Sequence, residues 1–176
     1  MNASVTRSLK GLRRLAPRAV PPVASILVFW AAIGGAQAQD LCPDIKHLID
    51  QARSQFVEIA VKSKDGADGR DAIVTLAGAS YCQVTKRSRR SAYHCGWEFP
   101  FRAQEAYDTF DEFARQANDC VGRHAILHSD RSVNHPDYYA SRRYEMEQAD
   151  LTVSVKDKSA LGRTLVFIRI QDKSAK

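Results

Sequence analysis

Residues 81–99 read YCQVTKRSRRSAYHCGWEF, and this stretch predicts the central element of the fold. Two strands, 81–86 and 92–99, are indicated on either side of a basic turn, because Tyr93, Cys95, Trp97 and Phe99 alternate with other residues. A four-residue loop places Cys82 opposite Cys95, within bridging distance of a disulfide. The stretch therefore predicts an antiparallel hairpin whose strands are cross-linked.

Two amphipathic helices are expected at 43–61 and 102–121, because apolar residues recur there at steps of three and four. Cys42 stands at the start of the first helix, and Cys120 stands at the end of the second. Antiparallel packing of the helices on one sheet brings those two ends together. The predicted disulfides are therefore Cys42–Cys120 and Cys82–Cys95.

A further strand is expected at 72–79, and a last hairpin joins 143–156 to 164–171 after a polar connection at 122–141. Leu151, Val153 and Val155 alternate with polar residues, which is typical of a sheet with one buried face. The predicted class is α+β, with an antiparallel sheet of about five strands and two helices packed on one face, in the order α-β-β-β-α-β-β.

This element order resembles the secretion-chaperone-like α+β sandwich of type III secretion chaperones across most of residues 39–176. The resemblance implies binding of another protein rather than catalysis. Those chaperones are cytosolic, lack a structural disulfide pattern and usually end in a further helix, whereas this chain has four cysteines and no pattern for such a helix.

The N-terminal residues 1–38 are typical of a bacterial secretory signal peptide, with five basic residues, an apolar run at 23–36 and a cleavage motif that ends at Ala38. The apolar run is shorter than the about 20 residues that a bilayer requires, so no membrane anchor is expected after cleavage. Residues 39–176 form one predicted domain. All four cysteines lie in it, which indicates the periplasm or the secreted medium.

The positive charge of the chain lies largely in the predicted signal peptide. Removing its five cations and no anions leaves 21 Lys and Arg against 20 Asp and Glu, so the net charge falls from +6 to +1. Only KRSRR at 86–90 is locally basic, and it is interpreted as a solvated turn. No nucleic-acid partner is predicted.

The densest group of possible metal ligands lies between His124 and Asp137, where imidazoles and carboxylates of the kind that bind zinc occur together. The candidates are His124, His128, Asp130 and His135. The segment has no glutamate of the H-E-x-x-H type, and ordinary loop histidines are the favoured interpretation. No cofactor is predicted, and a metal-binding protein or metal-dependent hydrolase remains an alternative.

No catalytic residue is predicted. His94 and Glu98 share a strand face and form the smallest possible general-base pair, but the sequence has no G-x-S-x-G nucleophile elbow and no glycine-rich phosphate loop. A polar pair on the sheet surface is expected instead.

Aromatic residues between the third strand and the second helix are candidates for a docking surface if they are exposed together: Trp97, Phe99, Phe101 and Tyr107. The edge strands of the sheet are another possible docking device. The predicted function is therefore an exported, non-enzymatic binding or accessory module that docks a protein or an envelope component. A periplasmic inhibitor or immunity-type protein is a further alternative.

Overall fold

The computed structural model describes residues 40–61, 69–87, 89–134 and 137–173, so the predicted signal peptide at 1–38 lies outside the described residues. The elements in chain order are α1 (Cys42–Ala52), β1 (Gly69–Asp71), β2 (Tyr81–Arg87), β3 (Arg90–Pro100), α2 (Gln104–Val121), η1 (Gly122–His124), β4 (Ile126–Asn134), β5 (Asp137–Glu145), β6 (Ala149–Lys158), η2 (Ser159–Leu161) and β7 (Arg163–Asp172).

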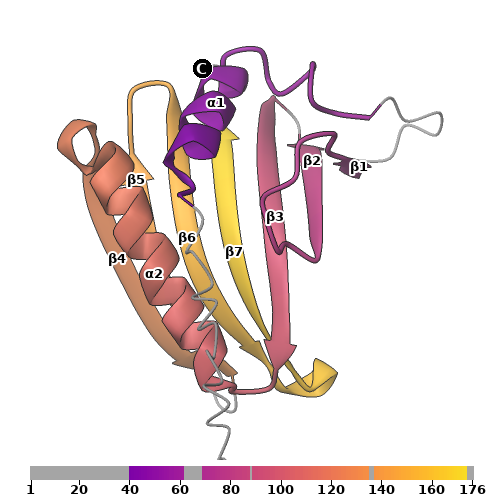
Figure 1. Ribbon diagram of the computed structural model, residues 1–176, viewed down its shortest axis with the longest axis vertical. Coiled ribbons are helices and arrows are strands. Elements are labelled where there is room, and N and C mark those ends of the chain that lie inside the picture. Colours follow the sequence, from indigo (N-terminus) through magenta and orange to yellow (C-terminus); the bar gives the residue numbers. More distant parts are fainter. Residues whose placement is uncertain (1–39, 62–68, 88, 135–136, 174–176) are drawn as a thin grey trace, which may run out of the picture. The chain divides into compact units, whose positions relative to one another are not determined.

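Seven strands form one antiparallel sheet in the order β1-β2-β3-β7-β6-β5-β4. Figure 1 shows α1 and α2 on the same side of this sheet. The α+β class with an antiparallel sheet is confirmed, whereas the expected five strands and the order α-β-β-β-α-β-β are wrong. Four strands follow α2 instead of two, so the element order that resembled secretion chaperones does not hold.

The hairpin of β2 and β3 has the register that its sequence predicts. Cys82 lies opposite Cys95, and Val84 lies opposite Tyr93. The two cysteines form a disulfide with their Cα atoms 4.1 Å apart. β7 then pairs with the other side of β3 and places Ile168 opposite Cys95, so this hairpin continues directly into the centre of the sheet.

The predicted polar connection at 122–141 is wrong, because it contains η1, β4 and the first half of β5. Every residue from 126 to 132 is exposed, so neither face of the edge strand β4 is buried along this stretch. Such a strand has no apolar alternation. The single strand expected at 143–156 is likewise the end of β5, a turn and most of β6.

Most of the segment expected as a strand at 72–79 does not pair with the sheet. Among the described residues nearby, pairing is limited to β1 and an isolated bridge between Ala60 and Ala72. Side chains of β3 bind carbonyl groups of the 72–79 segment instead. The Tyr93 hydroxyl donates to the Val74 carbonyl (3.0 Å), and the Trp97 indole donates to that of Ala77 (3.2 Å). The backbone is therefore partly satisfied without a neighbouring strand.

The first helix is shorter than the predicted 43–61, because α1 ends at Ala52. Gln55 and Phe56 then adopt left-handed backbone conformations with φ of 54° and 59°, which a right-handed helix does not allow. This turn directs the fully buried Phe56 into the core, where its ring lies 6.2 Å from that of Tyr93.

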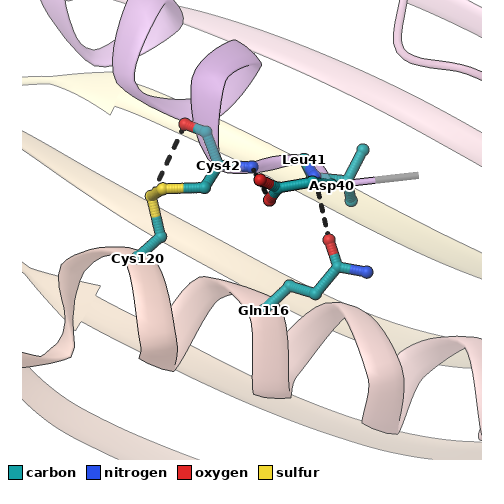
Figure 2. Close-up of a disulfide and its surroundings, with 5 residues drawn as sticks. All are labelled: Asp40, Leu41, Cys42, Gln116 and Cys120. Carbon is teal, nitrogen blue, oxygen red and sulfur yellow. Dashed lines mark hydrogen bonds between the residues drawn. A yellow bond between two sulfur atoms is a disulfide. The ribbon is translucent and has the colours of Figure 1, made fainter. Parts of the chain in front are cut away.

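A disulfide holds the start of α1 against the end of α2. The bond joins Cys42 to Cys120, the pair that antiparallel helices predict, with Cα atoms 5.4 Å apart (Figure 2). Beside it, the Leu41 amide donates to the Gln116 side-chain oxygen at 2.9 Å. Both helices pack on the sheet face that carries Val153, Val166 and Ile168, all fully buried. No helix of the described residues is long and apolar enough to cross a membrane.

Candidate functional site

The side of the sheet that faces away from α1 and α2 carries polar residues, and we call it the open face. Along β6 and β7, the buried residues Val153 and Ile168 alternate with Thr152 and Arg169. Successive residues of a strand point to opposite sides of a sheet. Since α1 and α2 lie on the apolar side (Figure 1), Thr152 and Arg169 point to the other side, which in the described part has no helix layer.

A row of basic and polar side chains crosses six strands on the open face, and we call it the arginine row. The strand register places Arg169 opposite both His94 and Thr152, and it places Arg143 opposite both Thr152 and His128. Opposed residues point to the same face. From β2 to β4, the row therefore reads Gln83, His94, Arg169, Thr152, Arg143 and His128.

The open face is hollowed into a concavity of ≈ 930 Å³. That volume lies in the range of ligand-binding clefts. Six Lys and Arg against two Asp and Glu line it, a local balance of 6 − 2 = +4. The cations are Lys86, Arg87, Arg90, Arg143, Lys156 and Arg169, and the acids are Asp130 and Asp150. Lys86, Arg87 and Arg90, which flank the basic turn, therefore belong to a larger basic surface.

The two central arginines of the row, Arg143 and Arg169, have no ion-pair or hydrogen-bond partner in the part of the chain that the structure describes. Arg143 and Arg169 are exposed, and neither forms an ion pair or a hydrogen bond with another described residue. By contrast, Arg163 pairs with Glu98. A guanidinium group that is held on a concave surface and not neutralised by the protein is well suited to a carboxylate, sulfate or phosphate.

His94 extends the arginine row without adding charge at neutral pH. Burial and, to a smaller extent, the positive charge of Arg169 lower the pKa of the His94 imidazole. Burial disfavours the charged form, and a neighbouring cation acts in the same direction. His94 therefore presents a neutral ring with one donor and one acceptor nitrogen.

The floor of the concavity is formed by small hydroxyl side chains beside aromatic rings. Ser141 lies opposite Ser154, which lies opposite Phe167. Both serines are buried and Phe167 is half-buried. On the next strand, Gly96 leaves room for the Tyr81 ring, whose Cζ atom is 2.6 Å from where a Cβ of residue 96 would lie. Ser141 and Ser154 thus leave space above the sheet for a ligand, whereas the Tyr81 ring fills the space over Gly96.

Lys156 lies at the far end of the concavity from the two arginines. Leu165 and Tyr139 lie opposite it on the neighbouring strands. The nearby Lys158 ammonium and burial lower the pKa of Lys156. An anionic ligand group would relieve the repulsion between these two lysines.

The candidate metal ligands that the structure describes lie on two different elements. His124 lies in η1, whereas His128 and Asp130 lie on β4, and His135 lies outside the described residues. The His128 Nε2 atom is 2.9 Å from a carboxylate oxygen of Glu145. Within the described ranges, no group of three or more His, Cys, Asp or Glu residues could hold a metal ion.

Three of the four candidate docking aromatics, Trp97, Phe99 and Tyr107, lie in or against the core. Trp97 is 6% exposed, and Phe99 and Tyr107 pack against the same core. Phe101 lies under the Arg102 guanidinium, 4.9 Å from it. Trp97 is thus buried, and Phe99, Phe101 and Tyr107 are half-buried.

His94 and Glu98 share the open face, as the strand alternation predicts, but Glu98 binds Arg163 there.

Comparison of the chain with protein-family models, with curated proteins and with solved structures found no match.

Part of the site can be predicted from the sequence, because Thr152, Ser154 and Lys156 alternate with buried valines and so indicate a sheet face exposed to solvent. The missing information was the long-range register that aligns this strand with Arg143 and Arg169.

Proposed function

We propose that this protein is an exported, non-enzymatic binding protein whose open face receives an anionic component of the periplasm, the cell envelope or the secreted medium. The observation that carries the proposal is the pair of arginines, Arg143 and Arg169, that lie without an ion-pair partner from the described residues in a concavity with a local charge of 6 − 2 = +4. Such charge complementarity selects anionic partners and accelerates their association.

Two features support a location outside the cytoplasm. The sequence at 1–38 is typical of a secretory signal peptide, and the structure contains two disulfides. Disulfides persist in oxidising compartments and are rare in the reducing cytoplasm. The scaffold is consistent with a binding role, since rigid strands hold the arginine row in a fixed position.

The test is native mass spectrometry of the protein recovered from the periplasm of producing cells. The wild-type protein is expected to carry a bound species that is absent from the Arg143→Glu/Arg169→Glu variant. A matched control is Arg123→Glu/Arg131→Glu, which makes the same charge change at exposed residues that do not line the concavity. Retention of the same species by the open-face variant would show that this face is not the binding site.

A further inference from the structure

We infer that the ligand of the open face is an acidic carbohydrate, meaning an oligosaccharide that bears carboxylate, sulfate or phosphate groups. This inference rests on the proposed function and names the chemical class of its ligand. Three parts of the concavity support it: the paired arginines, the hydroxyl and aromatic floor, and the distant lysine.

The first part is an anion site at the centre of the arginine row. Arg143 and Arg169 flank Thr152 on the two neighbouring strands. Adjacent strands lie about 4.8 Å apart, so the two arginine Cα atoms are separated by about 10 Å. Both long side chains can therefore reach one anionic group above Thr152, whose hydroxyl offers a further donor.

The second part is the floor, which suits a polyhydroxylated ring better than an acyl chain. Ser141, Ser154 and Thr152 offer hydroxyl groups that can both donate and accept hydrogen bonds. Phe167 and Tyr139 lie among them and provide flat aromatic surfaces. A sugar ring presents hydroxyl groups at its edge and C–H groups on its face, and it can therefore use both kinds of surface. A lipid tail would leave the serine hydroxyls of the floor unpaired.

The third part is Lys156, a second cation on the strand that carries Thr152. Lys156 follows Thr152 by four residue steps along the strand, a distance of about 14 Å. This span favours an elongated ligand with acidic groups at separate points rather than a single small anion. The serine and phenylalanine floor lies between the two cationic ends.

The first experiment is isothermal titration calorimetry with defined probes. Trigalacturonate and a heparin tetrasaccharide carry acidic groups on sugar rings, maltotriose is neutral, and inorganic sulfate is an anion without a sugar. At least one acidic oligosaccharide is expected to bind at least about tenfold more tightly than maltotriose and sulfate, a difference of about 1.4 kcal/mol. Failure of both acidic probes, or equal affinity for either control probe, would overturn the inference.

Single substitutions then locate the site. Arg143→Gln and Arg169→Gln are each expected to lower the affinity for the acidic probe about tenfold to a hundredfold, which is the range for the loss of a hydrogen bond to a charged group. Phe167→Ala should weaken binding without changing its dependence on salt, since no charge is lost. Arg123→Gln is the matched control and should leave affinity unchanged. If Arg123→Gln and Arg143→Gln lowered the affinity equally, the binding would be nonspecific electrostatic attraction and not recognition at this site.

Two further binding measurements distinguish an acidic carbohydrate from other polyanions. An oligothymidylate of similar charge and vesicles that contain phosphatidylglycerol are both expected to bind more weakly than the acidic oligosaccharide. Tighter binding to either would assign the face to a nucleic acid or a membrane surface and overturn the carbohydrate class. If the sugar probes fail while the periplasmic species still depends on Arg143 and Arg169, only the ligand class is wrong. If that species does not depend on them, the proposed function fails as well.

Discussion

At the scale of single residues, Asp157 shows how the fold accommodates a buried carboxylate. It is fully buried on the helix side of β6. Its oxygens accept hydrogen bonds from the Tyr107 hydroxyl (2.9 and 3.1 Å) and the Thr164 hydroxyl (2.7 Å), and Arg102 lies 3.5 Å away. A buried charge requires such partners. Through these hydrogen bonds Tyr107 connects the start of α2 to the sheet.

Replacing Tyr107 by phenylalanine should lower the free energy of unfolding by about 1.5–3 kcal/mol, because one donor to a buried carboxylate is lost. Urea unfolding measures this change. Tyr139→Phe is the control, since the Tyr139 hydroxyl makes no hydrogen bond with the described residues, and its effect should stay within about 0.5 kcal/mol. Equal effects of the two substitutions would contradict the role given to Tyr107.

The same contact predicts how stability changes at high pH. Burial and the hydrogen bond to Asp157 raise the pKa of Tyr107 from 10.0 to about 12. The folded state therefore favours the neutral phenol, and this contribution is present below pH 10 and is lost as the pH rises from 10 to about 12. The Tyr107→Phe protein should lose less stability across that interval, which urea unfolding at several pH values measures. A parallel decline in both proteins would exclude this linkage.

At the scale of elements, local patterns predict the parts of the fold whose two sides differ in polarity. The β2–β3 hairpin and α2 have such patterns, so the register of the one and the span of the other were predicted closely. The strand β4 was not predicted, because its residues are exposed on both faces and show no apolar alternation. The end of α1 was not predicted either, because no glycine in the sequence marks the left-handed turn at Gln55 and Phe56.

The Cys42–Cys120 disulfide should contribute about 4.5 kcal/mol by the chain-entropy relation, since its cysteines are 78 residues apart. Cys42→Ala/Cys120→Ala should lower the stability measured by urea unfolding by an amount of that order. The control is the same comparison in the presence of a reductant, where both proteins lack the cross-link and the difference should disappear. A difference that persists would indicate lost packing rather than lost chain constraint.

At the scale of the whole molecule, the distribution of charge carries more information than its sum. Residues 39–176 have a net charge of 21 − 20 = +1, whereas the residues that line the concavity have 6 − 2 = +4, so the remainder has −3. The sum follows from composition alone, whereas the basic residues that line the concavity come from β2, β3, β5, β6 and β7. Only the order of strands in the sheet brings them together, and no local pattern contains that order.

This concentration of cations should destabilise the unliganded protein at low salt. Sodium chloride is expected to raise the melting temperature of the wild-type protein more than that of Arg143→Gln/Arg169→Gln, as the Debye length falls from about 30 Å at 0.01 M to about 8 Å at 0.15 M. Thermal unfolding at the two ionic strengths measures this difference, and Arg123→Gln serves as the control. An identical salt response in all three proteins would argue against mutual repulsion on the open face.

The basic turn between β2 and β3 presents exposed cleavage sites to a trypsin-like protease. Lys86, Arg87, Arg89 and Arg90 are exposed, and a cut after Arg87 would divide the polypeptide between the partners of both disulfides, Cys42–Cys120 and Cys82–Cys95. The nicked chain should therefore gain the mass of one water and release no fragment until both bonds are reduced. The two cross-links would allow the protein to survive an encounter with such a protease as one covalent molecule.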